Sequence, residues 1–338
     1  MPRQARIDAP GALHHIICRG LERKAIFYDD FDRNDFVSRL ATILQQTSTP
    51  CFAWALIPNH FHLLLQTGTV PIATVMERLL TGYAGYFNRR HHRQGHLFQN
   101  RYKSILCQRE TYLLELVRYI HLNPVRAGIV DSVETLKHYS YCGHSALMGA
   151  CDDPTTWQAV DEVLCRFGPD SEKAQERYQA FVAEGVSAGK RPDLIGGGLL
   201  RSSGGWQNIA YARRYGEHLK SDERILGDSD FVEEVLGAAE EHMERLCTYL
   251  QKGLDLDGLA NVIAELLNVE ITEVWKGGKK SMTVKARSLL CYWAVRELGM
   301  TATAVSRRLN LTQPGVAGAV KRGEELATQN GWSLSRLI

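Results

Sequence analysis

Residues 54–67 read Trp-Ala-Leu-Ile-Pro-Asn-His-Phe-His-Leu-Leu-Leu-Gln-Thr, an apolar run that carries His60 and His62. Residues 51–67 are predicted to form β-structure with a turn or bulge at Pro58-Asn59, because both residues favour turns. Side chains two positions apart in a strand point to the same face of the sheet. The two imidazoles are therefore expected on one face, where they either bind a metal ion or serve in packing and hydrogen bonding.

The sequence around this run predicts an α+β fold. Further strands are expected at residues 12–19 and 102–107, and apolar residues at helical spacing predict helices at 31–46 and 72–90. Strands that alternate with helices in this way favour a compact sheet with helices on one face. The middle segment, 146–230, predicts helices near 157–167 and 172–188, followed by glycine-rich sequence that suits a flexible connector better than a phosphate-binding loop.

A second group of polar residues follows the apolar positions of residues 112–117. Their spacing predicts a helix, and Pro124 and Gly128 are typical of its end. Tyr119 and Asn123 are then one helical turn apart and share a face. A phenol and an amide oxygen presented together to a metal ion indicate attack by the tyrosine on a phosphodiester, with the asparagine as a third metal ligand.

Other aromatic and histidine residues compete for these roles. Tyr112 lies two helical turns before Tyr119, and the leucines that follow it favour a packing role. We interpret His96 and His121 as phosphate donors or structural histidines rather than as further metal ligands. Core packing or base stacking is expected of the remaining tyrosines in this region, Tyr83, Tyr86 and Tyr102.

Three stretches together resemble the REP-associated tyrosine transposases. They are His-Phe-His at 60–62, Gly-His-Leu-Phe-Gln-Asn-Arg-Tyr-Lys at 95–103 and Tyr-Ile-His-Leu-Asn-Pro-Val-Arg-Ala-Gly at 119–128, and the resemblance covers roughly residues 7–145. It implies a ferredoxin-like fold and a transposase that cleaves and rejoins single-stranded hairpin DNA through a 5′-phosphotyrosine. The same resemblance implies that Tyr119 is the nucleophile and that His60 and His62 bind Mg²⁺ or Mn²⁺, with Asn123 at the position of the third ligand.

The distribution of charge favours a nucleic-acid enzyme with two basic ends. Residues 1–150 contain 17 Lys and Arg against 11 Asp and Glu, residues 151–230 contain 10 against 14, and residues 276–338 contain 11 against 3. Basic surfaces are expected where a protein meets phosphates. We predict three parts: a catalytic domain at 1–145, a helical and glycine-rich connector at 146–230, and an all-α helix-turn-helix domain at 231–338.

The last part of the chain has the pattern of a helix-turn-helix. A short helix at 302–309 is followed by a turn at 310–313 and a basic helix at 314–326, with Thr312 placed to cap it and Pro314 tolerated in its first turn. The runs Leu-Ala-Asn-Val-Ile-Ala at 259–264, Lys-Gly-Gly-Lys-Lys at 276–280 and Lys-Ala-Arg at 285–287 resemble the DNA-binding domain of the replication initiator DnaA, from residue 257 onward. This resemblance implies binding to duplex DNA, but the run at 311–316 differs from the DnaA pattern, so the bound sequence does not carry over.

The candidate DNA contacts lie at both basic ends. In the catalytic region they are Arg89, Arg90, Arg93, Arg101 and Lys103. In the C-terminal domain they are Lys279, Lys280, Thr312, Gln313, Lys321 and Arg322.

The composition bears on the cellular location of the protein and on the state of its cysteines. The sequence has no apolar run of membrane-spanning length and no apolar signal core near its start, so we expect a cytoplasmic, nucleoid-associated protein with no membrane partner. Its eight scattered cysteines lack a Cys-x-x-Cys spacing and are expected to be free thiols. Besides an active transposase, two functions stay open: a domesticated DNA-binding regulator without catalysis, and a hydrolase in which the histidine pair activates water. The sequence also leaves open whether the protein acts as a monomer or a homodimer.

Overall fold

The computed structural model describes residues 7–9, 11–68, 70–150, 157–189, 191–195, 222–278 and 280–338. The chain divides into two compact units, residues 1–234 and 235–338, which we call the N-terminal and C-terminal units. The described residues contain no helix with the length and hydrophobicity needed to cross a lipid bilayer. Each unit is described by itself below.

The N-terminal unit is built on a five-stranded sheet in the order β2-β3-β1-β4-β5. The strands are β1 (Leu13–Arg19), β2 (Cys51–Ile57), β3 (His60–Gln66), β4 (Lys103–Cys107) and the short β5 (Ile225–Leu226). All neighbouring strands are antiparallel except β4 and β5. With α1 (Asp30–Thr47) after β1 and α2 (Ile72–Arg90) after β3, the first four strands have the ferredoxin-like topology, which confirms the predicted fold class.

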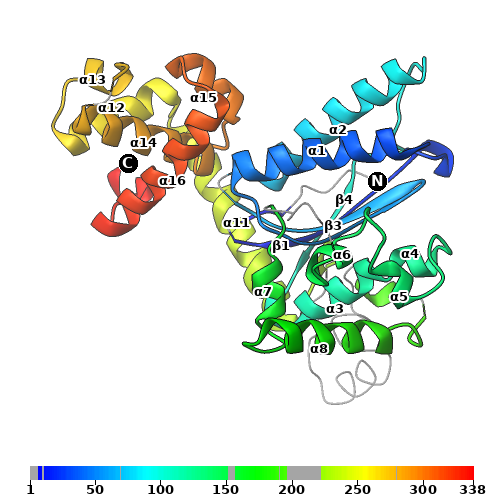
Figure 1. The fold of residues 1–338 in the computed structure, drawn as a ribbon. Helices are drawn as coiled ribbons and strands as arrows, with labels where there is room; N and C mark the ends of the chain where they lie inside the picture. Colours follow the sequence, from blue (N-terminus) through cyan, green and yellow to red (C-terminus); the bar gives the residue numbers. More distant parts are fainter. Residues whose placement is uncertain are drawn as a thin grey trace. The chain divides into compact units, whose positions relative to one another are not determined.

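Helices cover both faces of this sheet, so the expectation of a single covered face was wrong. In Figure 1, α1 and α2 lie on one face, and α3 (Arg109–His121) and the helices that follow it lie on the other. The reason is visible in the strands: every residue of β2 is buried, and β1 is buried except at Arg19. Strands that are apolar on both sides need cover on both faces.

Local signals explain how these elements begin and end. The Asp29 carboxylate caps α1 by accepting from the backbone N–H of Asp32, and Ser48 ends the helix in the left-handed conformation. Strands β2 and β3 form a hairpin whose two turn residues are Pro58 and Asn59, as the sequence predicts. The carbonyl of Pro58 accepts from the N–H groups of residues 26 and 27, which fixes the turn against the loop after β1.

On the second face of the sheet, α3 is followed by five further helices among the described residues. These are α4 (Asn123–Arg126), α5 (Val133–Leu136), α6 (His144–Leu147), α7 (Val160–Leu164) and α8 (Ser171–Glu184). Val163, Tyr178 and Val182 belong to the same buried core as Leu116 and Val117 of α3. Part of the predicted connector therefore packs on the sheet unit, and the proposed three-part division of the chain stays a prediction.

The C-terminal unit is helical in its described residues. It contains α12 (Leu256–Leu267), α13 (Ile271–Trp275), α14 (Ser281–Arg296), α15 (Ala302–Leu309), α16 (Gln313–Asn330) and α17 (Leu334–Leu337), preceded by α11 (Ser229–Gln251), in which the boundary between the units falls. Thr301 caps α15, and Asn310 ends it in the left-handed conformation. Thr312 then caps α16 through the N–H of Gly315, so the predicted cap is confirmed.

Candidate active site

Three imidazoles come together on the α3 face of the sheet. Strands β1 and β3 are neighbours, and Ile17 pairs with His62, so His15 lies diagonally across from His62 on the same face. The ring centroids of His60 and His62 are 5.2 Å apart, as their spacing predicts, and the rings of His15 and His62 stack at the same centroid distance. His15 and His62 are buried, whereas His60 is partly exposed.

The hydrogen bonds of His60 determine which of its nitrogens carries the proton. Its Nδ1 lies 2.7 Å from the Oδ1 of Asn59, and the Nδ2 of Asn59 donates to the carbonyl of Arg23, which fixes the amide orientation. Because an amide oxygen only accepts, Nδ1 of His60 is the donor and its Nε2 keeps a lone pair. Burial, together with the positive charge of Arg19, lowers the pKa of His60 to about 4, so the ring is neutral at physiological pH.

A longer chain of hydrogen bonds gives His62 the same tautomer. Nδ1 of His15 lies 3.1 Å from the carbonyl oxygen of Leu194, which only accepts, so this nitrogen carries the His15 proton. Nε2 of His15 then accepts, at 3.0 Å, from Nδ1 of His62. Burial lowers the pKa of His15 to about 4 and that of His62 well below its ordinary value. His62, like His60, therefore has its lone pair on Nε2.

This donor set fits a divalent metal ion. Neutral imidazole nitrogen is a common metal ligand, and in metal sites the other ring nitrogen usually donates to a neighbouring group, as it does here in both residues. Within the described residues, the Nε2 atoms of His60 and His62 have no hydrogen-bond partner, and no group of three or more His, Cys, Asp or Glu side chains is arranged to hold a metal. Among the described residues, a further ligand would be of another kind, such as an amide oxygen.

The ring of Tyr119 lies against these histidines. Its centroid is 5.9 Å from those of both His15 and His62, with the ring planes nearly perpendicular. The guanidinium of Arg126 lies over the Tyr119 ring, with its central carbon 5.1 Å from the ring centroid. Burial raises the pKa of Tyr119, while the charges of Arg126 and Arg19 oppose this effect. Among the described ring contacts, Tyr119 and not Tyr112 touches the histidine rings.

Asn123 does not share a helix with Tyr119, contrary to the sequence-based interpretation. Helix α3 ends at His121, Leu122 forms its cap, and Asn123 opens α4. The Nδ2 of Asn123 donates to the carbonyls of Tyr119 and Ile120, at 3.1 and 3.3 Å. Asparagine competes well for such backbone groups, and Pro124 lacks the N–H that would continue the helix. The Nδ2 atom thus holds the end of α3, which leaves Oδ1 as the atom for any metal.

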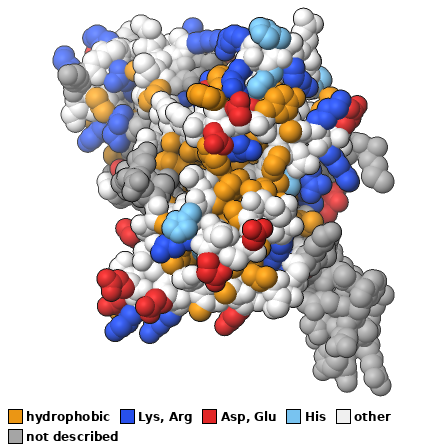
Figure 2. Space-filling view, turned by 45° about the vertical axis from the view of Figure 1, so that its right-hand side comes forward, with side chains coloured by type: hydrophobic (Ala, Val, Ile, Leu, Met, Phe, Trp, Pro, Cys, Tyr) orange, Lys and Arg blue, Asp and Glu red, His pale blue; other side chains and the backbone are white. Residues whose placement is uncertain are grey.

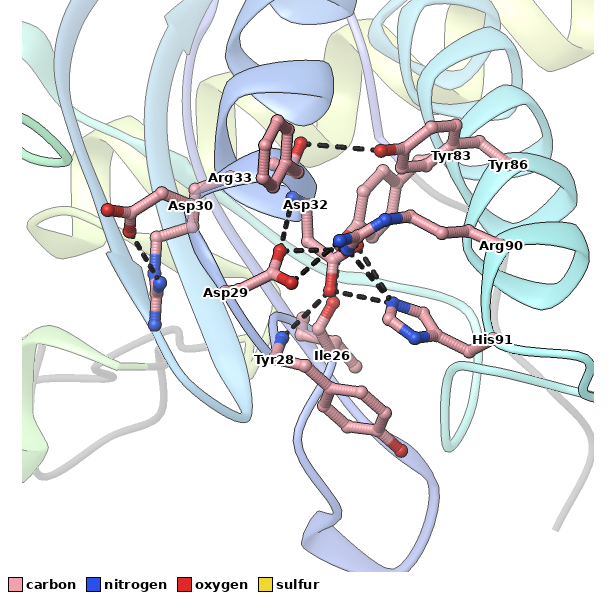
Figure 3. Close-up of polar contacts among 11 residues, drawn as sticks. Ile26, Tyr28, Asp29, Asp30, Asp32, Arg33, Tyr83, Tyr86, Arg90 and His91 are labelled. Carbon is pink, nitrogen blue, oxygen red and sulfur yellow. Dashed lines mark hydrogen bonds and ion pairs between the residues drawn. The ribbon is translucent and has the colours of Figure 1, made fainter.

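Arg90 has a structural role that its sequence context did not reveal. Figure 3 shows its guanidinium between α1 and α2, where Nη2 lies 2.7 Å from Asp29 and Nη1 lies 2.5 Å from Asp32. Nε2 of His91 lies 2.9 Å from the same Asp32 carboxylate, which is fully buried. The hydrogen bonds from Arg90 lower the pKa of Asp29 to about 2. The charge of Arg90 is therefore paired with carboxylates of the protein itself.

The other basic candidates of the N-terminal unit differ in exposure. Arg89 and Arg101 are exposed, Arg93 lies over the ring of Phe87, and Nζ of Lys103 donates to the carbonyl of Ile195 at 2.6 Å. On the face drawn in Figure 2, hydrophobic side chains gather across the centre, with charged side chains of both signs around them. Surface charge on that face therefore does not by itself mark a path for DNA.

In the C-terminal unit, two of the candidate DNA contacts already make hydrogen bonds within the protein. The hydroxyl of Thr312 caps α16, and Nε2 of Gln313 donates to Oγ1 of Thr303 at 2.7 Å, which links α16 to α15. Lys280 lies exposed at the start of α14, and Lys321 and Arg322 are exposed on α16. Lys279 lies outside the described residues.

Sequence reasoning assigned no role to two residues of this region. No sequence pattern indicates a role for His15, because its partners at positions 62 and 194 are far away in the chain. Arg126 is part of the run at 119–128, and its position over Tyr119 follows from the turn between α3 and α4. His121 is buried and its Nδ1 lies 2.7 Å from the hydroxyl of Tyr178, which supports the structural interpretation over phosphate contact.

Comparison with known proteins identifies the sheet region. Residues 10–123 match the family described as "Transposase IS200 like". One solved structure, "Structure of the REP associates tyrosine transposase bound to a REP hairpin", aligns at 14% identity and a TM-score of 0.37, over 46% of this chain and 91% of that chain. No curated protein matches the chain significantly. The matched residues make up about a third of the chain, and they are similar to an enzyme of the DNA-cleaving and rejoining kind.

Proposed function

We propose that this protein is a metal-dependent transposase that cleaves and rejoins single-stranded hairpin DNA through a covalent bond to Tyr119. The observation that carries the proposal is the packing of the Tyr119 ring against His62, whose Nε2 bears a lone pair. A nucleophile and a metal ligand lie side by side on the face of a transposase-type sheet.

The chemistry requires the Tyr119 phenol to lose its proton as it attacks. The phenolic oxygen forms a bond to phosphorus, the bond from phosphorus to the 3′ oxygen breaks, and that oxygen takes a proton to leave a 3′-hydroxyl. The 5′-phosphotyrosine conserves the bond energy, so rejoining needs no nucleotide cofactor. Because burial raises the pKa of Tyr119, the nearby Arg126 and Arg19 are needed to stabilise the phenolate.

His60 and His62 would hold the metal through their Nε2 atoms. A bound Mg²⁺ or Mn²⁺ supplies neutralisation of the charge on the scissile phosphate. Asn123 is retained as the proposed third ligand, through Oδ1, because its Nδ2 already donates to the backbone. Mixed nitrogen and oxygen ligation of this kind is compatible with Mn²⁺ and leaves room for water.

The DNA strand would be held by basic residues of the N-terminal unit whose side chains are exposed or partly exposed. Arg89, Arg93 and Arg101 are proposed to contact phosphates, and Lys103 would do so after release from the Ile195 carbonyl. Arg90 is left out of this set because its guanidinium is bound by Asp29 and Asp32.

The C-terminal unit is proposed to bind duplex DNA as a DnaA-like helix-turn-helix domain. What supports this is the order of capped helix, left-handed turn and capped basic helix in α15 and α16. The N-terminal part of a second helix of this type enters the major groove, and nearby basic residues meet phosphates. Lys280, Lys321 and Arg322 are exposed and suited to phosphates. Thr312 and Gln313 would contact bases after release of their hydrogen bonds to Gly315 and Thr303.

A covalent adduct tests the catalytic proposal. The full chain is incubated with a labelled hairpin oligonucleotide and Mn²⁺, and protein-linked DNA is measured on a denaturing gel. We expect Tyr119→Phe to lose the adduct by at least about 10³-fold, because the nucleophile is removed. The matched control, Tyr112→Phe, lies two turns earlier on the same helix and should keep it. An undiminished adduct in Tyr119→Phe would exclude Tyr119 as the nucleophile.

The same preparations test whether the C-terminal unit binds duplex DNA independently of adduct formation by the N-terminal unit. The double variant Lys321→Ala/Arg322→Ala should bind duplex DNA more weakly, with a salt dependence reduced by about two charges, and should form the covalent adduct as before. Unchanged duplex binding would remove α16 as the duplex-binding element. Duplex binding without any adduct in the wild type would instead favour a regulator without catalysis.

A further inference from the structure

We propose that His15 is a positioning residue for the metal site, which fixes the proton of His62 on Nδ1 and so presents Nε2 as the ligand atom. The inference rests on the proposed role of His62 as a metal ligand. It adds a third histidine to the site, together with the backbone carbonyl of Leu194. Neither His15 nor Leu194 contacts the substrate in this proposal, and both act only through His62.

The direction of the hydrogen bonds carries the argument. A backbone carbonyl has no proton to donate, so the 3.1 Å contact between Nδ1 of His15 and the Leu194 oxygen has a single polarity. A neutral imidazole has one N–H, and Nε2 of His15 is then obliged to accept. The 3.0 Å contact with His62 therefore places the proton on Nδ1 of His62.

Within the part of the chain that the structure describes, the His15 side chain has no hydrogen-bond partners other than Leu194 and His62. The side chain is fully buried, its ring stacks on His62 with an interplanar angle of 27°, and the edge of Tyr119 closes another side. No described carboxylate contacts the ring, and a buried imidazole without one is neutral. Rotating the ring would break both hydrogen bonds at once, so one orientation is enforced.

The segment that supplies the carbonyl is itself held in place. Leu194 is buried, and its neighbour Asp193 is paired with Arg191, which also reaches Glu115 of α3 at 3.4 Å. The same helix carries Tyr119. These contacts link the segment that contains Leu194 to the helix that contains Tyr119.

The two proposed ligands reach the same tautomer by different means. His60 is fixed locally, by the side chain of the preceding residue Asn59, whereas His62 is fixed across the sheet by His15. A change at His15 should therefore affect His62 and leave His60 as it is. This difference makes the proposal testable within one protein.

The first test reads the tautomer directly in the metal-free full chain. Long-range ¹H–¹⁵N NMR correlations of the histidine rings distinguish a protonated Nδ1 from a protonated Nε2. We expect Nδ1–H in both His60 and His62 of the wild type. In His15→Phe, which keeps a ring but removes both nitrogens, His62 should become a mixture of tautomers while His60 is unchanged. A protonated Nε2 on His62 in the wild type would overturn the proposal, and this holds even if the variant fails to fold.

The second test measures Mn²⁺ alone by calorimetry. We expect the Kd for Mn²⁺ to rise about 10- to 100-fold in His15→Phe, as for loss of other groups that orient a ligand, and His15→Gln, which can donate and accept at once, to recover part of the loss. The control is His14→Gln, at the adjacent buried histidine on the opposite face, which bonds Ser104 and Asp8 and should keep the wild-type Kd. An unchanged Kd in His15→Phe would overturn the proposal.

The two tests separate this inference from the proposed function. Absence of Mn²⁺ binding by the wild type would count against the metal-dependent function itself. The NMR result alone would then decide whether His15 sets the proton position of His62.

Discussion

The two units of this chain are stabilised in different ways. The N-terminal unit buries ionisable side chains, among them Asp32, His62 and His121, and each is engaged by specific partners. The buried polar side chains described in the C-terminal unit are hydroxyls only, those of Thr283, Ser288 and Ser306, in an otherwise apolar helical core. The N-terminal unit thus fixes polar groups in its interior, whereas the buried part described in the C-terminal unit is almost wholly apolar.

The largest expected effect is the loss of the buried charge pair in the N-terminal unit. Asp32→Ala would leave Arg90 and His91 without their common carboxylate, and breaking a buried pair costs about 3–5 kcal/mol of unfolding free energy. Urea unfolding followed by hydrogen exchange and mass spectrometry would locate the loss in the N-terminal unit. The matched control is Asp30→Ala, whose carboxylate is exposed and paired with Arg33, with an expected cost of about 0–1 kcal/mol. Equal losses in the two variants would contradict this interpretation.

The second largest expected effect is a difference between the two units in the loss of stability at acidic pH. The pKa is lowered by burial in five imidazoles of the N-terminal unit, and to about 4 in three of them. Each such group stays neutral in the folded protein but takes up a proton in the unfolded chain below about pH 6.5. Their stabilising contribution is therefore complete above that pH and is lost as the pH falls towards 4. The residues are His15, His60, His62, His121 and His144.

Between pH 7 and 5 we expect the N-terminal unit to lose stability on the order of a few kcal/mol, and the C-terminal unit, whose sequence contains the single histidine His242, to lose little. Hydrogen exchange corrected for its intrinsic pH dependence would measure both in one experiment. The low pKa of Asp29 affects stability only below about pH 4, outside this interval. Similar losses of stability in both units would show that the buried imidazoles of the N-terminal unit do not cause the acid destabilisation.

The smallest effect should appear where the C-terminal unit packs most closely. A Cβ added at Gly323 of α16 would lie 2.1 Å from the backbone oxygen of Ser288 on α14, so the two helices would have to move apart. Gly323→Ala is expected to cost about 1–3 kcal/mol, measured in the C-terminal unit alone. Gly237→Ala, with no atom within 4 Å of its added Cβ, serves as the control and should be neutral or slightly stabilising. A neutral Gly323→Ala would show that the helices can separate freely.

The sequence was informative wherever the deciding interactions are local. The strand spacing of His60 and His62, the turn at Pro58-Asn59 and the cap at Thr312 each depend on a few neighbouring residues, and the structure confirms them. The family resemblance added the topology of the sheet. These features required no knowledge of distant contacts.

Features that depend on distant partners could not be predicted in this way. The pairing of Arg90 with Asp32 and the chain from Leu194 through His15 to His62 join residues separated by 47 to 179 positions. No periodicity or motif specifies such contacts, because they arise when whole elements pack. Asn123 was misplaced for a different reason: its capping of α3 competes locally with the helix that the apolar pattern suggested.

Tyr178 imposes an asymmetry on two histidines that are chemically alike. Its hydroxyl lies 2.7 Å from Nδ1 of His121 and 2.8 Å from Nδ1 of His144, and it has one hydrogen to give. One ring must receive that hydrogen and the other must offer its own, so the pair exists in opposite protonation patterns. Their Nε2 atoms are buried without partners among the described residues, and one therefore presents a bare donor while the other presents a bare acceptor. Exchanging the two patterns would require a concerted relocation of protons through all three side chains.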